Sequence, residues 1–180
     1  MAIESVERIL GRPAAPQEVP GANAWVSVES ELGTTLPDDY KAFIESFGTG
    51  TIDEFVVVFN PFSRNKFVNL LERGRVELQA YRQLKGGHYV HEVFPSPGGL
   101  LPFASTDNGN VFYWKTSGSP NWWTVVVYEA RGPKYYEFKG GMAEFLTAVL
   151  TRAVKCDVLP RDFPSDRPAF VPIPVSSSRV

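Results

Sequence analysis

Four short runs of β-branched and aromatic residues in the middle of the chain constrain its fold more than any other feature. They cover residues 100–104, 111–116, 124–128 and 135–138, and glycine, proline, asparagine and serine lie between them. These intervening residues favour turns. Because strands that follow each other through short turns pair side by side, the pattern predicts an antiparallel meander. A fifth run, residues 54–59, has the same composition and is predicted to join the same sheet.

The turn between the first two runs also contains side chains with functional chemistry. Its sequence is Asp107-Asn108-Gly109-Asn110, in which the carboxylate and the amides could bind a metal or position a water. The same residue types adopt positive φ more readily than others and so suit a hairpin turn. Because two strands must be joined here, we interpret this segment as a turn and not as an active site.

Apolar residues at helical spacing predict helices before and after these strands. The spacing is found in residues 25–32, 40–47, 67–81 and 142–150, and a shorter helix is expected around residues 6–10. Asp38 is expected to cap the helix that ends before Gly48. Helices that flank a central, mostly antiparallel sheet define an α+β fold, and we expect the helices to lie on one face of the sheet.

The two ends of the chain differ in composition from the middle. Residues 1–24 contain several prolines and glycines and are treated as an N-terminal extension, and residues 25–155 form the predicted single domain. Residues 156–180 have a proline every few positions, which precludes a helix and predicts an extended C-terminal tail. Phe163, Phe170, Val171 and Ile173 give this tail apolar anchors. They predict that the tail packs along the domain, because a free linker would not need them.

The composition excludes several classes of protein. With 180 residues, 43% of them hydrophobic, the chain is long enough for one domain with a substantial core. A formal net charge of -2 provides no basic field for a nucleic acid. The acidic start lacks the features of a secretory signal, and no apolar run reaches the length of about 18 residues that spans a membrane. We therefore expect a cytoplasmic protein that binds neither nucleic acid nor membrane.

No set of residues points to catalysis, a metal or a cofactor. His88, His91 and Glu92 are the only cluster with metal-ligand chemistry, but two preceding glycines argue against the helix that an HxxH pair requires. We interpret both histidines as surface or loop residues. Cys156 is the single cysteine, and no neighbouring motif marks it as a nucleophile. The spacings of a P-loop and of a hydrolase nucleophile elbow are absent from the sequence.

Several short segments follow one another in an informative order. They are Glu31-Leu32-Gly33, residues 36–43 (LPDDYKAF), residues 47–52 (FGTGTI), residues 101–104 (LPFA), Asp107-Asn108-Gly109, the aromatic strand 111–114 and the helix around Glu144-Phe145-Leu146. In this order they resemble the SUKH superfamily of Smi/Knr-like domains, over about residues 25–152. The resemblance implies an α+β domain without enzymatic activity. Many bacterial members look like immunity proteins that neutralise a co-encoded toxin, whereas fungal relatives regulate wall assembly.

From this resemblance we expect a non-enzymatic domain that binds another protein. The leading hypothesis is a monomeric immunity protein that neutralises a cognate polymorphic toxin, for example a nuclease, by direct binding. The alternative is a cytosolic regulatory or scaffold protein of the Smi/Knr-like type with no toxin partner. The fold alone does not distinguish between the two, because one fold supports many functions.

Two groups of residues are candidates for the surface that binds the partner. Asp38, Asp39, Asp53 and Glu54 lie around the helix 38–47 and its exit. These acids could meet a basic surface, although solvation and helix capping would also explain them. Trp122 and Trp123 could anchor a partner, although packing in the core would also explain them. In a strand the two would point to opposite faces, so that one of them could be partly exposed.

Overall fold

The computed structural model describes residues 2–85, 87, 89–132 and 134–174. Within this part of the chain, five α-helices pack on an antiparallel sheet of seven strands, which makes the protein an α+β domain. The helices are α1 (Ala2–Leu10), α2 (Ala24–Leu32), α3 (Asp38–Phe47), α4 (Leu70–Leu84) and α5 (Met142–Leu150), with a 3-10 turn, η1, at Pro120–Trp122. The strands are β1 (Gly50–Ile52), β2 (Val56–Val58), β3 (Leu100–Thr106), β4 (Val111–Lys115), β5 (Thr124–Tyr128), β6 (Tyr135–Phe138) and β7 (Phe170–Pro172). None of these described helices has the length and apolar character needed to cross a membrane.

The strands are ordered β6-β5-β4-β3-β2-β1-β7, and each one pairs antiparallel with its neighbours. All five predicted runs lie in this sheet, which confirms the meander. The residues between β3 and β4 form the turn that we interpreted from the sequence, with Gly109 at a φ of 91°. Thr106 closes this turn, because its Oγ1 accepts a hydrogen bond from the Asn110 backbone N–H at 2.9 Å.

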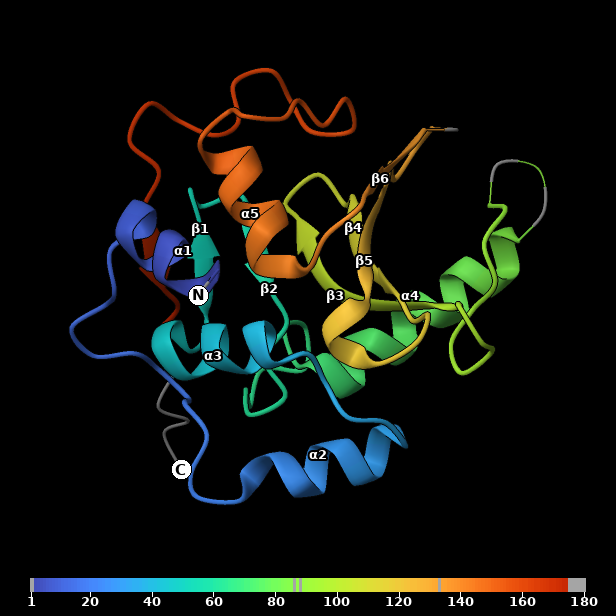
Figure 1. The fold of residues 1–180 in the computed structure, drawn as a ribbon, viewed down its shortest axis with the longest axis horizontal. Coiled ribbons are helices and arrows are strands. Elements are labelled where there is room, and N and C mark those ends of the chain that lie inside the picture. The colour runs from blue at the N-terminus through green and yellow to red at the C-terminus, as the bar shows by residue number, and fades with distance from the viewer. Residues whose placement is uncertain (1, 86, 88, 133, 175–180) are drawn as a thin grey trace.

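Both faces of the sheet are buried, because β4 and β5 carry apolar side chains at successive positions. Phe112 and Trp114 face the main hydrophobic core, to which α1, α3 and α5 contribute. Tyr113 and Val126 face the other side, which α4 covers with residues such as Tyr81. Figure 1 shows α4 across the sheet from α1, α3 and α5. The expectation that all helices lie on one face is therefore wrong, since a sheet with two apolar faces needs cover on both.

Helix α4 begins later than its periodicity predicted. Its first residue is Leu70, and the Asn69 side chain caps it by accepting hydrogen bonds from two backbone N–H groups of the first turn. Phe67, which we placed in this helix, lies in the preceding turn and is 64% exposed. An apolar residue at the right spacing does not extend a helix past a side chain that caps it.

The N-terminal helix α1 packs into the main core. Its apolar face, formed by Ile3, Val6 and Leu10, is buried with residues of α3 and α5. The Ser46 hydroxyl of α3 donates a hydrogen bond to the Glu7 carboxylate at 2.6 Å, which adds a polar contact between the two helices. The packing of α1 thus contributes to the same core that holds α3 and α5.

The C-terminal tail packs on the domain as far as residue 174, which agrees with the prediction from its apolar residues; residues 175–180 lie outside the described part of the chain. Strand β7 pairs with β1, and the Phe170 ring lies 5.0 Å from the Phe47 ring between centroids. A Cβ at Gly50 would overlap the Phe170 ring, so this close approach requires glycine. We did not predict β1 or β7, because each has only three residues and β7 ends in a proline.

Replacing Phe170 with alanine should destabilise the fold, because the change removes a buried ring from the core. We expect the free energy of unfolding to fall by about 3–5 kcal/mol, the usual range for a buried phenylalanine. Val171 lies on the same strand and is 39% exposed, so Val171→Ala is a matched control that should cost less than about 1 kcal/mol. Urea denaturation measures both changes. Equal losses in the two variants would contradict a packing role for Phe170.

Candidate binding cleft

A cleft of about 650 Å³ opens between the start of α3, the η1 turn and the start of α5. Its lining includes Asp38, Asp39, Trp122 and Trp123, four of the six residues that we considered for partner binding from the sequence. Trp114, Asn121, Thr124, Lys139 and Glu144 complete the polar and aromatic lining. The volume falls within the range of about 300–1,000 Å³ that is usual for ligand pockets. The cleft is therefore the first candidate for a functional site.

A reciprocal pair of hydrogen bonds joins the walls formed by α3 and η1. The Asp38 backbone N–H donates to Asn121 Oδ1 at 2.8 Å, and Asn121 Nδ2 donates to Asp38 Oδ2, also at 2.8 Å. The prediction that Asp38 caps its own helix is wrong, because Pro37 occupies the N-cap position. The Asp38 side chain instead holds the turn that carries Trp122 in place beside α3.

Asp39 caps a helix other than its own. Its Oδ2 accepts a hydrogen bond from the Ala143 backbone N–H at 2.9 Å, in the first turn of α5. The residue at the N-cap of α5 is Gly141, which has no side chain, so an acceptor from another element fills this role. Burial raises the pKa of Asp39, and hydrogen bonds from the Ala143 and Tyr40 backbone groups oppose this effect only in part. Asp39 therefore positions the wall of the cleft that α5 forms.

The two adjacent tryptophans occupy very different environments. Trp122 is 80% exposed, whereas Trp123 is 3% exposed and its indole donates to the Gly118 carbonyl oxygen at 3.2 Å. Trp122 is the last residue of η1 and Trp123 follows it directly, so neither lies in a strand, although one of the two is exposed as expected. Pro120 favours this turn, because its fixed φ suits the first position of a helical turn. Trp122 is the exposed aromatic group of the cleft, and Trp123 belongs to the core.

Trp114 forms the buried part of the lining. Its ring packs against Tyr40 and Phe103, with centroid separations of 4.9 Å and 4.6 Å. The Nε1–H of this indole is buried, yet it has no hydrogen-bond acceptor among the described residues. A buried donor without an acceptor costs about 1–3 kcal/mol, so this atom is an unusual feature of a cleft lining.

Carboxylates outnumber cations in the described lining of the cleft. Asp38, Asp39 and Glu144 are present together with the ammonium group of Lys139. Glu144 Oε2 accepts a hydrogen bond from the Gly141 backbone N–H at 3.1 Å, so it also satisfies a group at the start of α5. Negative charge is favourable at the N-terminus of a helix, which explains part of this cluster. We did not select Glu144 or Lys139 from the sequence, because no spacing shows that α5 starts beside α3.

Asp53 and Glu54 lie elsewhere, in the turn between β1 and β2, where each has a φ of 53°. The Asp53 carboxylate accepts hydrogen bonds from the backbone N–H groups of Ser165 and Ala169 at 2.8 Å and 3.0 Å, and another from the Ser165 hydroxyl. Asp53 therefore fastens the C-terminal tail to the domain. Glu54 is its exposed neighbour in the turn.

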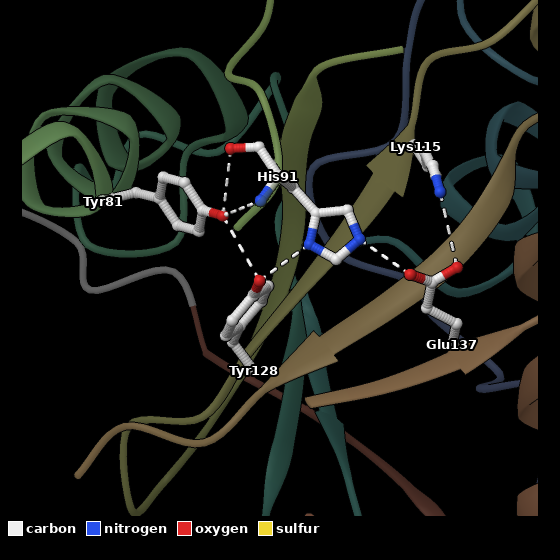
Figure 2. Close-up of polar contacts among 5 residues, drawn as sticks. All are labelled: Tyr81, His91, Lys115, Tyr128 and Glu137. Atoms are coloured by element: carbon white, nitrogen blue, oxygen red, sulfur yellow. Dashed lines mark hydrogen bonds and ion pairs between the residues drawn. The ribbon is translucent and has the colours of Figure 1, made fainter. Parts of the chain in front are cut away.

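A second polar cluster joins the loop after α4 to the face of the sheet that α4 covers (Figure 2). His91 Nδ1 lies 2.7 Å from Tyr128 Oη, and His91 Nε2 lies 2.7 Å from Glu137 Oε1. The His91 backbone N–H donates to Tyr81 Oη at 3.1 Å, and Lys115 Nζ lies 3.4 Å from the other Glu137 oxygen. The interpretation of His91 as a loop residue is correct, but it is buried and not on the surface. His88 lies outside the described residues.

The order of carboxylate, imidazole and hydroxyl in this cluster matches that of a catalytic triad, but the hydroxyl belongs to a tyrosine. Burial raises the pKa of Tyr128 and that of Tyr81, so both phenols stay protonated near neutral pH. The described His, Cys, Asp and Glu residues include no group of three that could hold a metal ion. We therefore interpret the cluster as the anchor of the loop that contains His91.

The environment of Cys156 suits a packing residue. The side chain is buried in the main core. Burial raises the pKa of its thiol, which disfavours the reactive thiolate. The structure therefore adds no support for a nucleophilic cysteine.

The protein is thus an α+β domain in which the starts of α3 and α5 and the turn that carries Trp122 surround the cleft. The family model described as SUKH_6, SMI1-KNR4 cell-wall, matches residues 23–146, which include all the cleft residues named above. The chain therefore belongs to the SUKH family of Smi/Knr-like domains, as its resemblance predicted. This family is generally non-catalytic and is known for immunity-type proteins. None of the curated proteins or solved structures matches the chain significantly.

Removing the Asp39 side chain should destabilise the domain, because the Ala143 N–H of α5 then loses its acceptor. We expect Asp39→Ala to lower the free energy of unfolding by about 0.5–2 kcal/mol, the range for lost helix caps. Asp39→Asn keeps an acceptor oxygen and removes a carboxylate that burial disfavours, so it should cost less than the alanine variant. Urea denaturation near neutral pH measures both. Equal losses would contradict the capping role.

The contribution of Glu137 to stability should depend on pH. Burial alone would raise the pKa of Glu137, but the hydrogen bond with His91 and the positive charge of Lys115 lower it below its ordinary value. The folded state therefore favours the carboxylate. This contribution is complete above the ordinary glutamate pKa of about 4.3 and is lost as the pH falls through the lowered folded-state value.

The stability difference between wild type and Glu137→Gln should accordingly shrink in acid. Urea denaturation at a series of pH values from about 6 to about 3 measures it, because protonation of the folded carboxylate removes the advantage over glutamine. Glu54→Gln is the matched control, since Glu54 is an exposed acid in a turn. A Glu137→Gln difference that stays constant over this range would contradict the prediction.

Proposed function

We propose that this chain is a non-enzymatic immunity protein that binds and neutralises a cognate polymorphic toxin in the cytoplasm, as a monomer. The observation that carries the proposal is the cleft, in which the exposed Trp122 indole lies beside carboxylates. Membership of a family known for immunity-type proteins supports it. Neutralisation by binding requires a surface that can hold a partner tightly, and the cleft has the properties of such a surface.

Trp122 has the properties of an interface anchor. Tryptophan is among the residues that most often dominate the binding energy of protein interfaces, and such anchors lie where a partner can exclude water from them. The turn that carries Trp122 is held to α3 by the reciprocal bonds between Asp38 and Asn121. A surface that is ordered before binding loses less conformational entropy when the partner arrives.

The acids of the cleft have two different tasks in this proposal. Asp38 is exposed, so it can attract a basic surface and increase the association rate. Asp39 is partly buried and positions α5, whereas Trp123 is buried and holds the turn. Substitutions of Asp38 and Trp122 are therefore the informative ones, because neither side chain belongs to the core.

Trp122→Ala should weaken toxin binding by about 2 kcal/mol or more, roughly thirtyfold, because it removes the aromatic anchor. The test is co-expression with the toxin domain encoded beside the gene, followed by measurement of the dissociation constant. Asp38→Lys should slow association and change its salt dependence, and it should also loosen the turn that carries Trp122, because it removes the acceptor of the Asn121 amide. Phe67→Ala is the matched control, since Phe67 is also a largely exposed aromatic residue but lies before α4 and not in the cleft lining.

Two outcomes would contradict this proposal in different ways. If the wild-type chain neither protects cells nor binds the toxin domain, the immunity function is wrong. If Trp122→Ala protects and binds like the wild type while remaining folded, the interface lies on another surface. Unfolding measurements on each variant establish that a loss of binding is not a loss of structure.

The alternative is a cytosolic regulatory or scaffold protein of the Smi/Knr-like type with no toxin partner. The description of the matching family model, which refers to the cell wall, favours keeping this alternative. The neighbouring reading frame distinguishes the two. A large modular protein that ends in a small toxin domain supports immunity, whereas an isolated locus supports regulation.

A further inference from the structure

We propose that the outer edge of β6 binds an extended acidic segment of another protein, which adds to the seven-stranded sheet as a further strand. This surface is separate from the cleft, because the hollow beside β6 and the cleft share no described lining residue. It does not depend on the proposed function. Three features carry the proposal: backbone groups of β6 without a partner, the hollow beside this edge, and an excess of cations around it.

Strand β6 is the last strand on its side of the sheet, and in the described part of the chain it pairs only with β5. Just before β6, the Glu129 backbone N–H donates to the Lys134 carbonyl oxygen at 3.0 Å. Hydrogen-bonded pairs alternate along an antiparallel ladder, so this bond fixes which residues of β6 bond to β5. They are Tyr136 and Phe138, which pair with Val127 and Val125.

The backbone groups of Tyr135 and Glu137 consequently point away from the sheet. Among the described residues, none forms a hydrogen bond with the backbone N–H or C=O group of either residue. A second extended chain complements such an edge, because its own donors and acceptors alternate with the same spacing. The edge therefore suits a polypeptide strand better than a nucleic acid or a small ligand.

A hollow of about 530 Å³ provides space beside this edge, between β6 and the segment 155–161. Tyr135 and Tyr136 both line it. Neighbouring residues of a strand point to opposite faces of the sheet, so a hollow that both residues line borders the edge between those faces. Tyr135 is 42% exposed, and its ring can pack against a β-branched side chain of an added strand.

Cations outnumber carboxylates in the described lining of this hollow. Lys134, Lys155 and Arg161 contribute positive charge, and Asp157 contributes negative charge. Asp157 pairs with Lys155 at 3.4 Å, whereas neither Lys134 nor Arg161 forms an ion pair within the part of the chain that the structure describes. The excess is local, because the whole chain has a formal net charge of -2. An acidic segment would complement it.

A second copy of this chain is a less suitable occupant of the edge. Pairing of two β6 strands would bring two cationic hollows together, and like charges repel. Lysines on edge strands oppose such self-pairing, and Lys134 and Lys139 flank β6. An acidic strand is attracted by the same charges. We therefore expect carboxylates at the positions of the added strand that face Lys155 and Arg161, with β-branched residues between them.

Amide hydrogen exchange of the ¹⁵N-labelled full chain tests the strand addition, with acetyl-Glu-Val-Glu-Val-Glu-amide as the probe. In the free chain, the Tyr136 and Phe138 amides should be protected by β5, and the Tyr135 and Glu137 amides should exchange rapidly. A peptide concentration about ten times the dissociation constant should slow exchange of the latter two about tenfold. The Tyr136 and Phe138 amides should change less.

Two sets of control peptides separate the contribution of charge from that of the backbone. A peptide with glutamine in place of each glutamate should bind at least about fivefold more weakly, because it loses three charges. N-methylation of single peptide residues should give an alternating pattern, since only every second N–H of an added strand faces β6. Equal effects of methylation at neighbouring positions would contradict strand addition.

A variant of the chain tests the charge from the other side. Arg161→Gln should weaken binding of the glutamate peptide about two- to fivefold and leave the affinity for the glutamine peptide unchanged. Lys66→Gln is the matched control, because Lys66 is an exposed cation outside the lining of this hollow. Unfolding measurements on both variants establish that a change in affinity is not a loss of structure.

Two results would overturn the inference: equal binding of the glutamate and glutamine peptides, or rapid exchange of the Tyr135 and Glu137 amides at high peptide concentration. Protection of these amides in the free chain that is lost on dilution would identify a second copy as the occupant, and would also overturn it. The toxin experiments concern the cleft, so their failure leaves this inference intact. Failure of the peptide experiments equally leaves the proposed function intact.

Discussion

The burial of both faces of the sheet is the constraint on which the rest of the structure depends. Strands β4 and β5 present apolar side chains to both sides, so helices must cover both. Three helices, α1, α3 and α5, share one side, and two of them begin next to each other beside η1. The start of a helix has backbone N–H groups without partners inside the helix. The cleft thus forms where helices forced onto one face bring their polar ends together.

The acids of the cleft therefore contribute to structure as well as to its surface charge. Asp39 on α3 caps α5, and Asp38 holds the turn that carries Trp122. A substitution at either position changes the geometry of a wall in addition to the charge on it. Trp122 differs, because its exposed ring has no comparable structural task. Substitution of Trp122 therefore changes the binding surface with less effect on the walls of the cleft than substitution of either aspartate.

The sequence predicted the meander and most helices, because composition, turn residues and periodicity are local signals. From the sequence we did not predict that a helix covers the second face of the sheet. The successive apolar residues of β4 and β5 indicated that both faces would be buried. Strands β1 and β7 were missed because three residues establish no alternation, and only tertiary pairing defines them. The run 124–128 was predicted with the bounds that β5 has, but the 3-10 turn that begins at Pro120 and carries Trp122 was not predicted, because three residues show no helical periodicity.

The candidate site was predictable only in part. Asp38, Asp39, Trp122 and Trp123 meet at one cleft, whereas Asp53 and Glu54, close to the first two in sequence, do not. Acids that are close in sequence were therefore treated as one group, although the fold places them on different parts of the domain. The roles of Asn121, Lys139 and Glu144 depend on contacts between distant segments, and a single sequence contains no signal for those contacts. A helix that starts after two glycines indicates that an outside cap is needed, but not which residue supplies it.

The pairing of β7 with β1 has a consequence for how the chain folds. The two strands come from opposite parts of the sequence, so their pairing closes a very long loop, and contacts of this kind form late and slowly. During synthesis, the domain can assemble its meander before the last strand is available. Until then the backbone groups of β1 form an open sheet edge, which is a template for pairing with another chain. Once the tail is made, β7 pairs with β1 and covers this edge. The tail thus protects a newly made molecule from aggregation through β1.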